Sequence, residues 1–166
     1  MKKELIIPGA LLGGGLFVAD QITKYLALFA LQGGNIAVLP FFNLVLVWNR
    51  GVSFGMFSDG NDLTPYVLIA LSLFITAGLL WWLTRIDDKP LFLAICAVIG
   101  GAIGNIIDRI IHGAVIDFLD FHAFGWHYPA FNIADSAIVL GIAFILFDSI
   151  IREPKRKGSQ RDEKRS

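Results

Sequence analysis

Five aspartates in apolar surroundings are the residues best suited to chemistry in this sequence. Asp20, Asp108 and Asp135 fall within or at the ends of long apolar stretches, and Asp117 and Asp120 follow one closely. Two carboxyl groups held close together cannot both ionise easily, so such a pair shares one proton. The pair then offers one base that activates water and one acid that polarises a carbonyl group. The aspartates therefore indicate acid–base hydrolysis, although spacing alone does not choose between Asp117 and Asp120.

Basic and amide side chains recur at helical spacing beside these aspartates. Asp20 and Lys24 are four residues apart, which lets them pair along one face of a helix with the acid first. Asn105, Asp108 and Arg109 follow at spacings of three and four, so the amide shares a face with one or both charges. In both groups the alternative is purely structural: opposite charges neutralise one another so that the helix can enter a membrane.

Asn132 precedes Asp135 by three residues, the pattern of a helix N-cap followed by an acidic residue in the first turn. Helix capping is the structural interpretation of this pair. The same geometry also serves chemistry, because the partial positive charge at a helix start favours a carboxylate there and offsets the opposite effect of burial. Both residues are therefore candidates for the site.

Other nucleophiles and metal ligands are poorly placed. The single cysteine, Cys96, lies deep in an apolar run, where a thiol packs and is inert, and a lone cysteine excludes an intrachain disulfide. Nothing in the sequence fixes Ser53 near a base. His112, His122 and His127 lack metal-ligand spacing and are expected at an interface. We therefore expect no metal, no organic cofactor and no nucleic-acid partner.

The elements that carry these residues are those of a membrane protein. The chain of 166 residues is 55% apolar and only 17% charged, against about 25% charged in an ordinary soluble domain. A membrane-spanning helix needs about 20 mostly apolar residues. Four stretches meet this length, at about residues 5–31, 64–84, 90–111 and 132–151. We therefore expect a membrane all-α fold with four transmembrane helices, the first of them too long to be a cleaved signal peptide.

The Lys and Arg residues predict how these helices are oriented. All but three of the 14 lie at the amino terminus, in the link near residues 85–89 or after residue 151. Basic residues near helix ends collect on the cytoplasmic side, so we expect both termini in the cytoplasm and the two longer connections outside. Residues 1–151 then form the membrane domain, and residues 152–166 form a basic cytoplasmic tail that is expected to be disordered.

The two longer connections have distinct patterns. Residues 41–48 are rich in β-branched and aromatic side chains, residues 49–51 are typical of a turn, and residues 52–57 form a second apolar run. We therefore expect a small strand unit within residues 32–63, between the first two helices and against the outer membrane surface. In the second connection, residues 112–131, aromatic side chains suit the belt at a membrane boundary.

With this topology, three helices bring polar residues to one depth. The polar groups of the first and third stretches lie near their outer ends, and Asn132 begins the fourth. A charged side chain at the centre of a membrane helix costs about 2.5–3.5 kcal/mol on insertion scales, so such residues are rare and often functional. We therefore expect the active site in this shared layer, just below the outer surface.

Five short motifs, in this order and on this topology, resemble those of the lipoprotein signal peptidases (signal peptidase II). The motifs are Asp20-Gln-Ile-Thr-Lys24, Asn49-Arg-Gly-Val-Ser-Phe-Gly55, Gly100-Gly-Ala-Ile-Gly-Asn-Ile-Ile-Asp-Arg109, Val115-Ile-Asp-Phe118 and Phe131-Asn-Ile-Ala-Asp135. Each is weak alone, but together they are specific. The resemblance, over residues 10–150, implies an aspartic endopeptidase of the bacterial inner membrane. It would remove the signal peptide from diacylglyceryl-modified prolipoproteins, cleaving before the lipidated cysteine.

The resemblance also implies roles for individual residues. It selects Asp117 over Asp120 as one catalytic aspartate and Asp135 as its partner. The positions that match residues lining the substrate cavity or supporting the pair are Asn49, Asn105, Arg109, Asn132, Asp20 and Lys24. We expect Asp135 to be mainly ionised and to activate water, while Asp117 holds the shared proton. Membrane lipid and the cyclic-peptide inhibitors of the family are further expected partners.

Two other functions would use the same buried charges. A proton-coupled transporter or channel subunit would spread ionisable residues through the membrane depth, whereas here they gather at one end and Asp148 alone lies near the other. An intramembrane aspartic protease of the presenilin type would carry a Gly-x-Gly-Asp motif, which this sequence lacks. The distribution of the charges therefore favours the signal peptidase.

Overall fold

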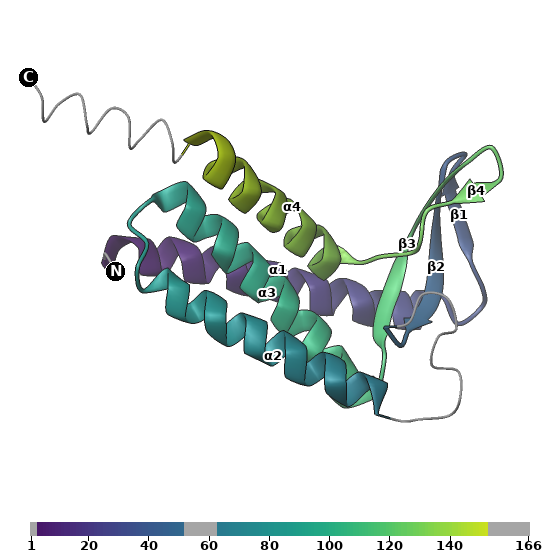
Figure 1. The fold of residues 1–166 in the computed structure, drawn as a ribbon. Coiled ribbons are helices and arrows are strands. Elements are labelled where there is room, and N and C mark those ends of the chain that lie inside the picture. Colours follow the sequence, from purple (N-terminus) through teal and green to yellow (C-terminus); the bar gives the residue numbers. More distant parts are fainter. Residues whose placement is uncertain (1–2, 52–62, 153–166) are drawn as a thin grey trace, which may run out of the picture.

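The computed structural model describes residues 3–51 and 63–152, which form a helical bundle with a small sheet at one end (Figure 1). Among these residues the helices are α1 (Lys3–Ala30), α2 (Thr64–Leu83), α3 (Lys89–His112) and α4 (Ile133–Phe147). A π-helical turn, η1 (Asp148–Arg152), continues α4. With that turn included, the four described helices are long and apolar enough to cross a membrane. They confirm the four predicted stretches to within a few residues.

Local sequence explains where α2 and α3 begin and where α3 ends. Pro65 and Pro90 lie in the first turn of each helix, where a missing backbone N–H breaks no helical hydrogen bond. Asp88 caps α3 by accepting a hydrogen bond from the Leu91 N–H at 3.0 Å. The helix ends at Gly113, whose φ of 70° suits glycine. The chain can therefore turn directly from α3 into the sheet.

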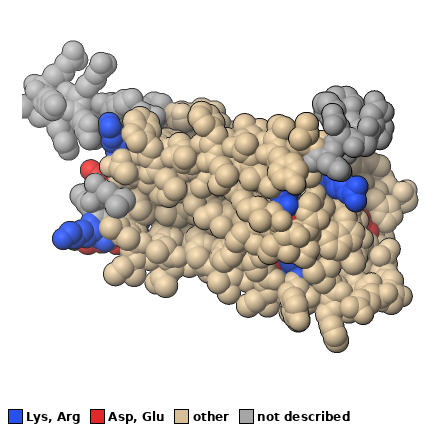
Figure 2. Space-filling model, turned by 90° about the horizontal axis from the view of Figure 1, so that it is seen from below, with Lys and Arg blue, Asp and Glu red and all other residues tan. Residues whose placement is uncertain are grey.

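Apolar side chains cover the outside of the bundle. Leu11, Phe74 and Leu140 are 72%, 78% and 70% exposed. The face in Figure 2 is mostly uncharged between its two ends, where most of its Lys, Arg, Asp and Glu side chains gather. Large exposed apolar surfaces of this kind mark contact with a membrane or a partner, and the helix lengths identify the membrane.

The core is built around α3, the most buried of the four described helices. Ile95 is fully buried in a cluster with Leu5 and Phe92, where α1 and α3 meet. Gly13 and Gly100 let these two helices approach so closely that a side chain on either would meet the backbone of the other helix. Small residues commonly permit such close packing in membranes. The contact fixes the relative position of the two helices that carry most of the polar residues.

The sheet lies at the end of the bundle opposite residues 3 and 152 (Figure 1). Its antiparallel strands, in spatial order, are β1 (Ile36–Leu39), β2 (Phe42–Asn49), β3 (Val115–Ala123) and β4 (Trp126–His127). The central pair, β2 and β3, therefore joins the connection after α1 to the connection after α3.

The strand predictions are confirmed only in part. The predicted strand at residues 41–48 is β2, displaced by one residue. Its hairpin partner in the described part of the chain is β1, which the sequence did not indicate. The predicted second run, residues 52–57, lies outside the described residues, as do Ser53 and residues 153–166 of the predicted tail. The connection at residues 112–131 supplies β3 and β4, which were not predicted.

Candidate active site

Phe131 ties the start of α4 to strand β3. Its N–H donates to the Leu119 carbonyl at 3.1 Å, and its carbonyl accepts from the Phe118 and Leu119 N–H groups at 3.1 and 2.9 Å. Asn132, the N-cap of α4, follows immediately. This pairing therefore brings the first turn of α4 beside Asp117 on β3, although Asp117 and Asn132 are 15 residues apart in the sequence.

Asn132 caps α4 and at the same time reaches Asp117. Its Oδ1 accepts from the Asp135 N–H at 2.8 Å, and Asp135 Oδ2 accepts from the Asn132 N–H at 3.3 Å, which completes a capping box. Asn132 Nδ2 donates to Asp117 Oδ1 at 2.7 Å. The predicted cap is confirmed, and the same residue links the two aspartates, called the dyad below.

Two further amides complete the surroundings of the dyad. Asn49, at the end of β2, donates from Nδ2 to Asp117 Oδ2 at 2.9 Å. Asn105, on α3, donates from Nδ2 to Asp135 Oδ1 at 2.7 Å. Together with the two contacts from Asn132, each of the four carboxyl oxygens accepts an N–H. The orientation of both carboxyl groups is therefore fixed by hydrogen bonds from three separate elements.

Burial raises the pKa of Asp117 from its ordinary value of 3.8 to about 7. Hydrogen bonds from Asn49 and Asn132 and the charge of Lys24 lower this pKa in part, whereas the negative charge of Asp135 raises it further. The Asp117 side chain is almost completely buried, with an exposure of 1%. Near neutral pH the site can therefore hold one proton on Asp117.

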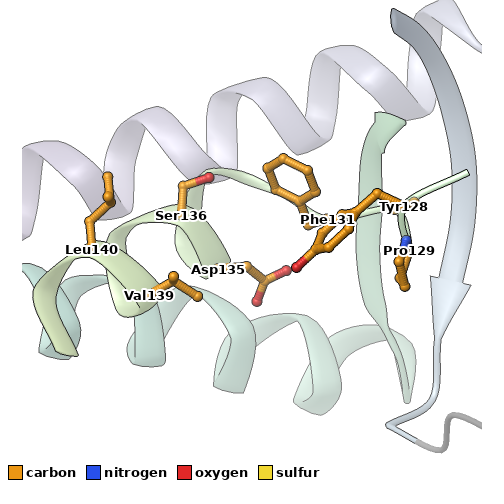
Figure 3. A pocket seen from close by; sticks show the side chains of 8 residues that line it. Tyr128, Pro129, Phe131, Asp135, Ser136, Val139 and Leu140 are labelled. Carbon is orange, nitrogen blue, oxygen red and sulfur yellow. The ribbon is translucent and has the colours of Figure 1, made fainter. Parts of the chain in front are cut away.

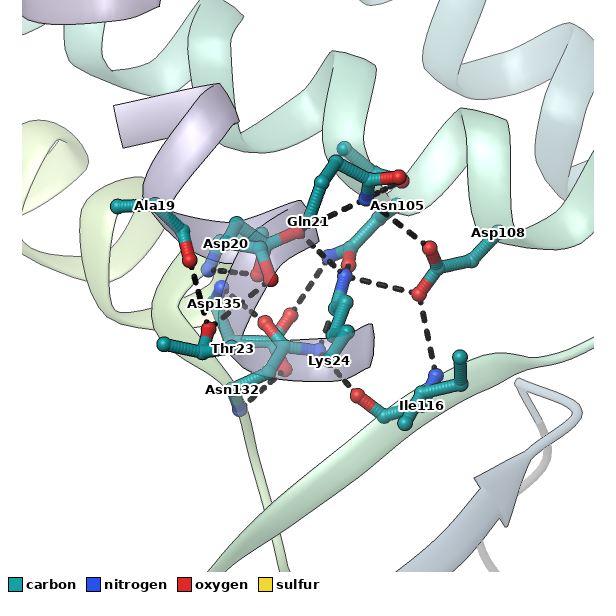
Figure 4. A network of polar contacts seen from close by, with 12 residues as sticks. Ala19, Asp20, Gln21, Thr23, Lys24, Asn105, Asp108, Ile116, Asn132 and Asp135 are labelled. Atoms are coloured by element: carbon teal, nitrogen blue, oxygen red, sulfur yellow. Dashed lines mark hydrogen bonds and ion pairs between the residues drawn. The ribbon is translucent and has the colours of Figure 1, made fainter. Parts of the chain in front are cut away.

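Lys24 is the centre of a buried network behind the dyad (Figure 4). Its ammonium contacts Asp20 Oδ2 at 2.7 Å, Asp108 Oδ2 at 2.8 Å and Asn105 Oδ1 at 3.0 Å. The predicted pair of Asp20 and Lys24 is confirmed, and Asp108 joins it. Because Lys24 occupies Oδ1 of Asn105, the amide nitrogen of Asn105 faces Asp135.

The same network holds the main chain beside each member of the dyad. Asp20 Oδ1 accepts from the Ala134 N–H at 2.8 Å, and Asp108 Oδ2 accepts from the Ile116 N–H at 3.1 Å. Gln21 Nε2 donates to both carboxylates, at 3.2 Å to Asp20 and 3.1 Å to Asp108. Gln21 and both backbone contacts were not predicted from the sequence. The only available signal was the place of Gln21 within the first motif.

Arg109 lies at the edge of the site with an unused donor. Its Nη1 donates to the Asn105 carbonyl at 3.3 Å, and its charge acts on Asp135, Asp117 and Asp108. Asp108 nevertheless makes its ion pair with Lys24, so the simple neutralisation of Asp108 by Arg109 is not what the structure shows. The buried Nε of Arg109 has no hydrogen-bond partner among the described residues. Arg109 therefore keeps a hydrogen-bond donor that the described residues do not use.

Asp120 is held on the other side of β3. Side chains alternate along a strand, so Asp117 and Asp120, three positions apart, point to opposite faces. Asp120 accepts from Asn43 Nδ2 at 3.0 Å and contacts His127 Nδ1 at 2.9 Å. Burial acts to raise the pKa of Asp120, but these contacts and the nearby His122 outweigh it, so the pKa is lowered. The structure therefore distinguishes Asp117, which lies in the dyad, from Asp120, which lies on the opposite face of β3. The spacing of residues in the sequence could not make this distinction.

The cysteine and the histidines take no part in the dyad network. Cys96 is half-buried on α3. His122 and His127 stack with their ring centres 4.8 Å apart, and His112 lies edge-on to Trp48 at 5.5 Å. Across residues 3–51 and 63–152, no group of three or more His, Cys, Asp or Glu side chains is arranged to hold a metal ion.

A pocket of about 450 Å³ opens beside Asp135 (Figure 3), within the range of about 300–1,000 Å³ that is usual for ligand sites. It lies between one face of α4 and the segment that leads into this helix. Its lining residues are Tyr128, Pro129, Ala130, Phe131, Asp135, Ser136, Val139 and Leu140. The lining is mainly apolar, and in Figure 3 the Asp135 carboxyl group points towards Tyr128. An apolar ligand in this pocket would therefore lie against one member of the dyad.

Every residue that the sequence analysis placed at the site belongs to one connected set of contacts. The set comprises Asp117, Asp135, Asn49, Asn105, Arg109, Asn132, Asp20 and Lys24. Polar groups of α1, α3 and the start of α4 contact one another as expected, and β2 and β3 add Asn49 and Asp117.

Comparisons with known proteins point to one family. The family model described as "Signal peptidase (SPase) II" matches residues 13–151. The "Lipoprotein signal peptidase" of Burkholderia vietnamiensis (strain G4 / LMG 22486) is 44% identical over 162 residues, which cover 92% of this chain and 97% of that protein. The protein of the same name from Burkholderia multivorans (strain ATCC 17616 / 249) has the same identity and coverage.

Solved structures of bacterial membrane enzymes share the fold. One, described as "Bacterial membrane enzyme structure by the in meso method at 2.3 A resolution", has a TM-score of 0.75 and 29% sequence identity, and the match covers 92% of each chain. A second, described in the same words at 1.9 A resolution, has a TM-score of 0.74 and 30% identity, with 88% of this chain and 94% of that chain covered.

Proposed function

Because this chain belongs to the signal peptidase II family, and so is a bacterial membrane protease that removes signal peptides from prolipoproteins, we propose that Asp117 and Asp135 are its catalytic residues. One observation carries this proposal. Asn132 contacts both carboxyl groups, donating to Asp117 from its amide at 2.7 Å and to Asp135 from its backbone at 3.3 Å. Two neighbouring carboxyl groups that share one proton are the apparatus of an aspartic protease.

The two aspartates take different roles in this proposal. Asp135 lies in the first turn of α4, where the helix dipole favours a carboxylate, and it acts as the base that takes a proton from water. The water oxygen attacks the peptide carbonyl carbon while Asp117, whose pKa is about 7, gives its proton to the carbonyl oxygen. The C–N bond then breaks as Asp135 protonates the leaving nitrogen. Asp117 recovers its proton from the hydroxyl group, which restores the starting state.

The other polar residues support this chemistry in two ways. Asn49, Asn105 and Asn132 donate hydrogen bonds from their amide groups to the dyad and so fix its geometry. Arg109 keeps a buried Nε–H without a partner in the described part of the chain. We assign Arg109 to the substrate, where its charge stabilises the developing negative charge on the carbonyl oxygen or holds a neighbouring backbone carbonyl.

The proposed substrate carries a diacylglyceryl group on the cysteine that follows the cleaved bond. The apolar pocket beside Asp135 supports this choice, because its Val139 and Leu140 walls are 64% and 70% exposed and continue the lipid-facing surface of α4. An acyl chain could move from the bilayer into the pocket without crossing water, and each buried CH₂ group contributes about 0.8 kcal/mol. Membrane lipid and cyclic-peptide inhibitors of the family are proposed as further ligands of this enzyme.

We place the sheet end of the bundle on the outer side of the bacterial inner membrane. The basic residues near residues 85–89 and the chain termini support this orientation. The dyad then lies near the lipid headgroups, where the bond next to a lipidated cysteine would be held.

Substitution of the aspartates tests the assignment. Asp117→Asn and Asp135→Asn should each lower kcat for a diacylglyceryl-modified precursor by about 10²–10⁴-fold, because each removes a group that must carry a proton. Asp120→Asn is the matched control and should change kcat only slightly, since Asp120 lies on the opposite face of β3. The product is identified by its mass, with an unmodified precursor run in parallel.

The folded state of each variant is checked by its thermal unfolding in detergent. Near-normal turnover by either dyad variant would contradict the assignment. A total loss of activity in Asp120→Asn alone would mean that the catalytic acid is Asp120.

A further inference from the structure

A third carboxyl group, Asp108, lies behind the dyad and belongs to neither catalytic role. It is 2% exposed on α3. One of its oxygens, Oδ2, accepts both from Lys24 Nζ at 2.8 Å and from the backbone N–H of Ile116 at 3.1 Å. The other oxygen accepts from Gln21 Nε2 at 3.1 Å. Asp108 therefore joins α1, α3 and β3 through a single oxygen atom.

The contact with Ile116 acts directly on the backbone that carries Asp117. Ile116 immediately precedes Asp117, and it is 2% exposed. Asn132 Nδ2 also contacts the Ile116 carbonyl at 3.2 Å. The backbone N–H of Ile116 is therefore bound by a residue of α3, and its carbonyl is bound by the residue that caps α4. A shift of the Asp108 oxygen would therefore move the peptide group that joins Val115 to Ile116, one residue before Asp117.

A similar set of contacts, which also starts at the Lys24 ammonium, holds the backbone next to Asp135. Lys24 Nζ contacts Asp20 Oδ2 at 2.7 Å, and Asp20 Oδ1 accepts from the N–H of Ala134 at 2.8 Å. Ala134 immediately precedes Asp135. One buried ammonium thus holds two carboxylates (Figure 4). Each carboxylate binds the backbone N–H of the residue that precedes one catalytic aspartate.

We propose that Asp108 is a positioning residue that, with Lys24 as the common anchor, sets the place of Asp117 relative to Asp135. This inference rests on the proposed catalytic roles of the two aspartates. Its physical basis is that the Asp20 and Asp108 carboxylates, which hold the two backbone N–H groups, both bind the ammonium of Lys24, so the two backbone contacts cannot change independently. The competing explanation is that Asp108 only neutralises the charge of Lys24 within the membrane.

Two substitutions of Asp108 distinguish a positioning role from neutralisation of the Lys24 charge. Asp108→Asn removes the negative charge but keeps an oxygen that can accept from both Lys24 and the Ile116 N–H, and Gln21 can present its own amide oxygen to the new amino group. Asp108→Glu keeps the charge, but its additional methylene displaces the oxygen from the Ile116 N–H. A positioning role therefore predicts an active Asn variant and an impaired Glu variant, whereas a neutralising role predicts the reverse.

The experiment measures kcat and KM for a diacylglyceryl-modified precursor in both variants. We expect Asp108→Asn to keep kcat within about threefold, the scale of one hydrogen bond. We expect Asp108→Glu to lose kcat by about 100-fold, the loss associated with a misplacement of about 1 Å. KM should change little, because the displaced group acts in the transition state.

Asp148 supplies the matched control at the other end of the bundle. It is also 2% exposed and bonds Arg152 at 2.9 Å, far from the sheet. Asp148→Asn and Asp148→Glu make the same chemical changes in a buried ion pair, and both should leave kcat unchanged even where thermal stability falls. If Asp108→Glu does not fold, Asp108→Ala takes its place, because alanine offers no oxygen to Ile116.

The proposal is overturned if the Asn variant loses more activity than the Glu or Ala variant, or if all Asp108 variants keep the kcat of the unchanged enzyme. It is also overturned if the Asp148 variants lose kcat to the same extent. Failure of the catalytic assignment would look different, since Asp117→Asn would then remain active. Inactive dyad variants together with unaffected Asp108 variants would reject this inference alone.

Discussion

At the scale of single residues, the burial of Asp117, offset in part by the amides of Asn49 and Asn132, sets the pH range in which the site can work. The pKa of Asp117 is about 7 in the folded protein and near 3.8 in an unfolded chain. Between these values the folded state binds more protons than the unfolded state, so the free energy of unfolding falls as pH rises from about 4 to about 7 and then levels off. The folded protein therefore loses the proton that the proposed mechanism needs near pH 7, at the upper end of the range in which the fold becomes less stable.

The first prediction concerns the pH dependence of activity. kcat/KM should fall as pH rises above about 7, because Asp117 loses the proton that it gives to the carbonyl oxygen. Asn49→Ala should move this decrease to higher pH, since the Asn49 hydrogen bond lowers the pKa of Asp117. The measurement is the pH profile of kcat/KM on a lipid-modified precursor.

Asn43→Ala is the control for this profile. It removes a similar amide contact, at 3.0 Å, from Asp120 on the other face of β3. The pH profile should keep its position in this variant. A profile that moves with Asn43→Ala, or that does not move with Asn49→Ala, would contradict the role given to Asp117.

At the scale of elements, the packing of α1 on α3 decides whether the buried network can form. A Cβ on Gly13 would lie 2.6 Å from the Cys96 carbonyl oxygen, whereas one on Gly14 would have nothing within 4 Å. Gly13→Ala should therefore destabilise the protein by about 1–3 kcal/mol through overpacking. Gly14→Ala should stabilise it by up to about 1 kcal/mol, because alanine favours the helix.

The same pair of variants should also differ in activity. Displacement of α1 moves Asp20 and Lys24 away from α3, so Gly13→Ala should lose turnover as well as thermal stability, while Gly14→Ala keeps both. Thermal unfolding in detergent and turnover of one precursor measure the two effects. Equal melting temperatures for the two variants would show that the close approach at Gly13 does not constrain the helices.

The helices could be predicted, but of the four described strands only β2 was predicted. The thickness of the bilayer sets the length of an apolar helix, so the four spans followed from hydropathy alone. Strand β3 was missed because its residues 115–118 are all buried, which removes the alternation of exposed and buried positions that marks a strand. Its aspartates also resemble loop residues. Recognition of β3 as a strand would have separated Asp117 from Asp120 without any resemblance.

At the scale of the whole molecule, the charged layer is sheltered at the boundary between the helices and the sheet. Asp20, Lys24 and Asp108 are nearly inaccessible, and removal of one partner from such a buried ion pair typically costs about 3–5 kcal/mol. That polar residues of three helices would form one layer was predictable from their positions within the four spans. It was not predictable that Lys24 would bind both Asp20 and Asp108, since this depends on how α1 and α3 are rotated relative to each other.

Infrared titration follows the proton of the dyad itself. In the whole protein in a bilayer, the carbonyl absorption of one protonated carboxyl group should disappear as pH rises through about 7. The absorption should be absent in Asp117→Asn. In Asp135→Asn it should disappear at lower pH, because the negative charge of Asp135 raises the pKa of Asp117. An absorption that survives in Asp117→Asn, or that titrates at the same pH in Asp135→Asn, would contradict a proton shared by these two aspartates.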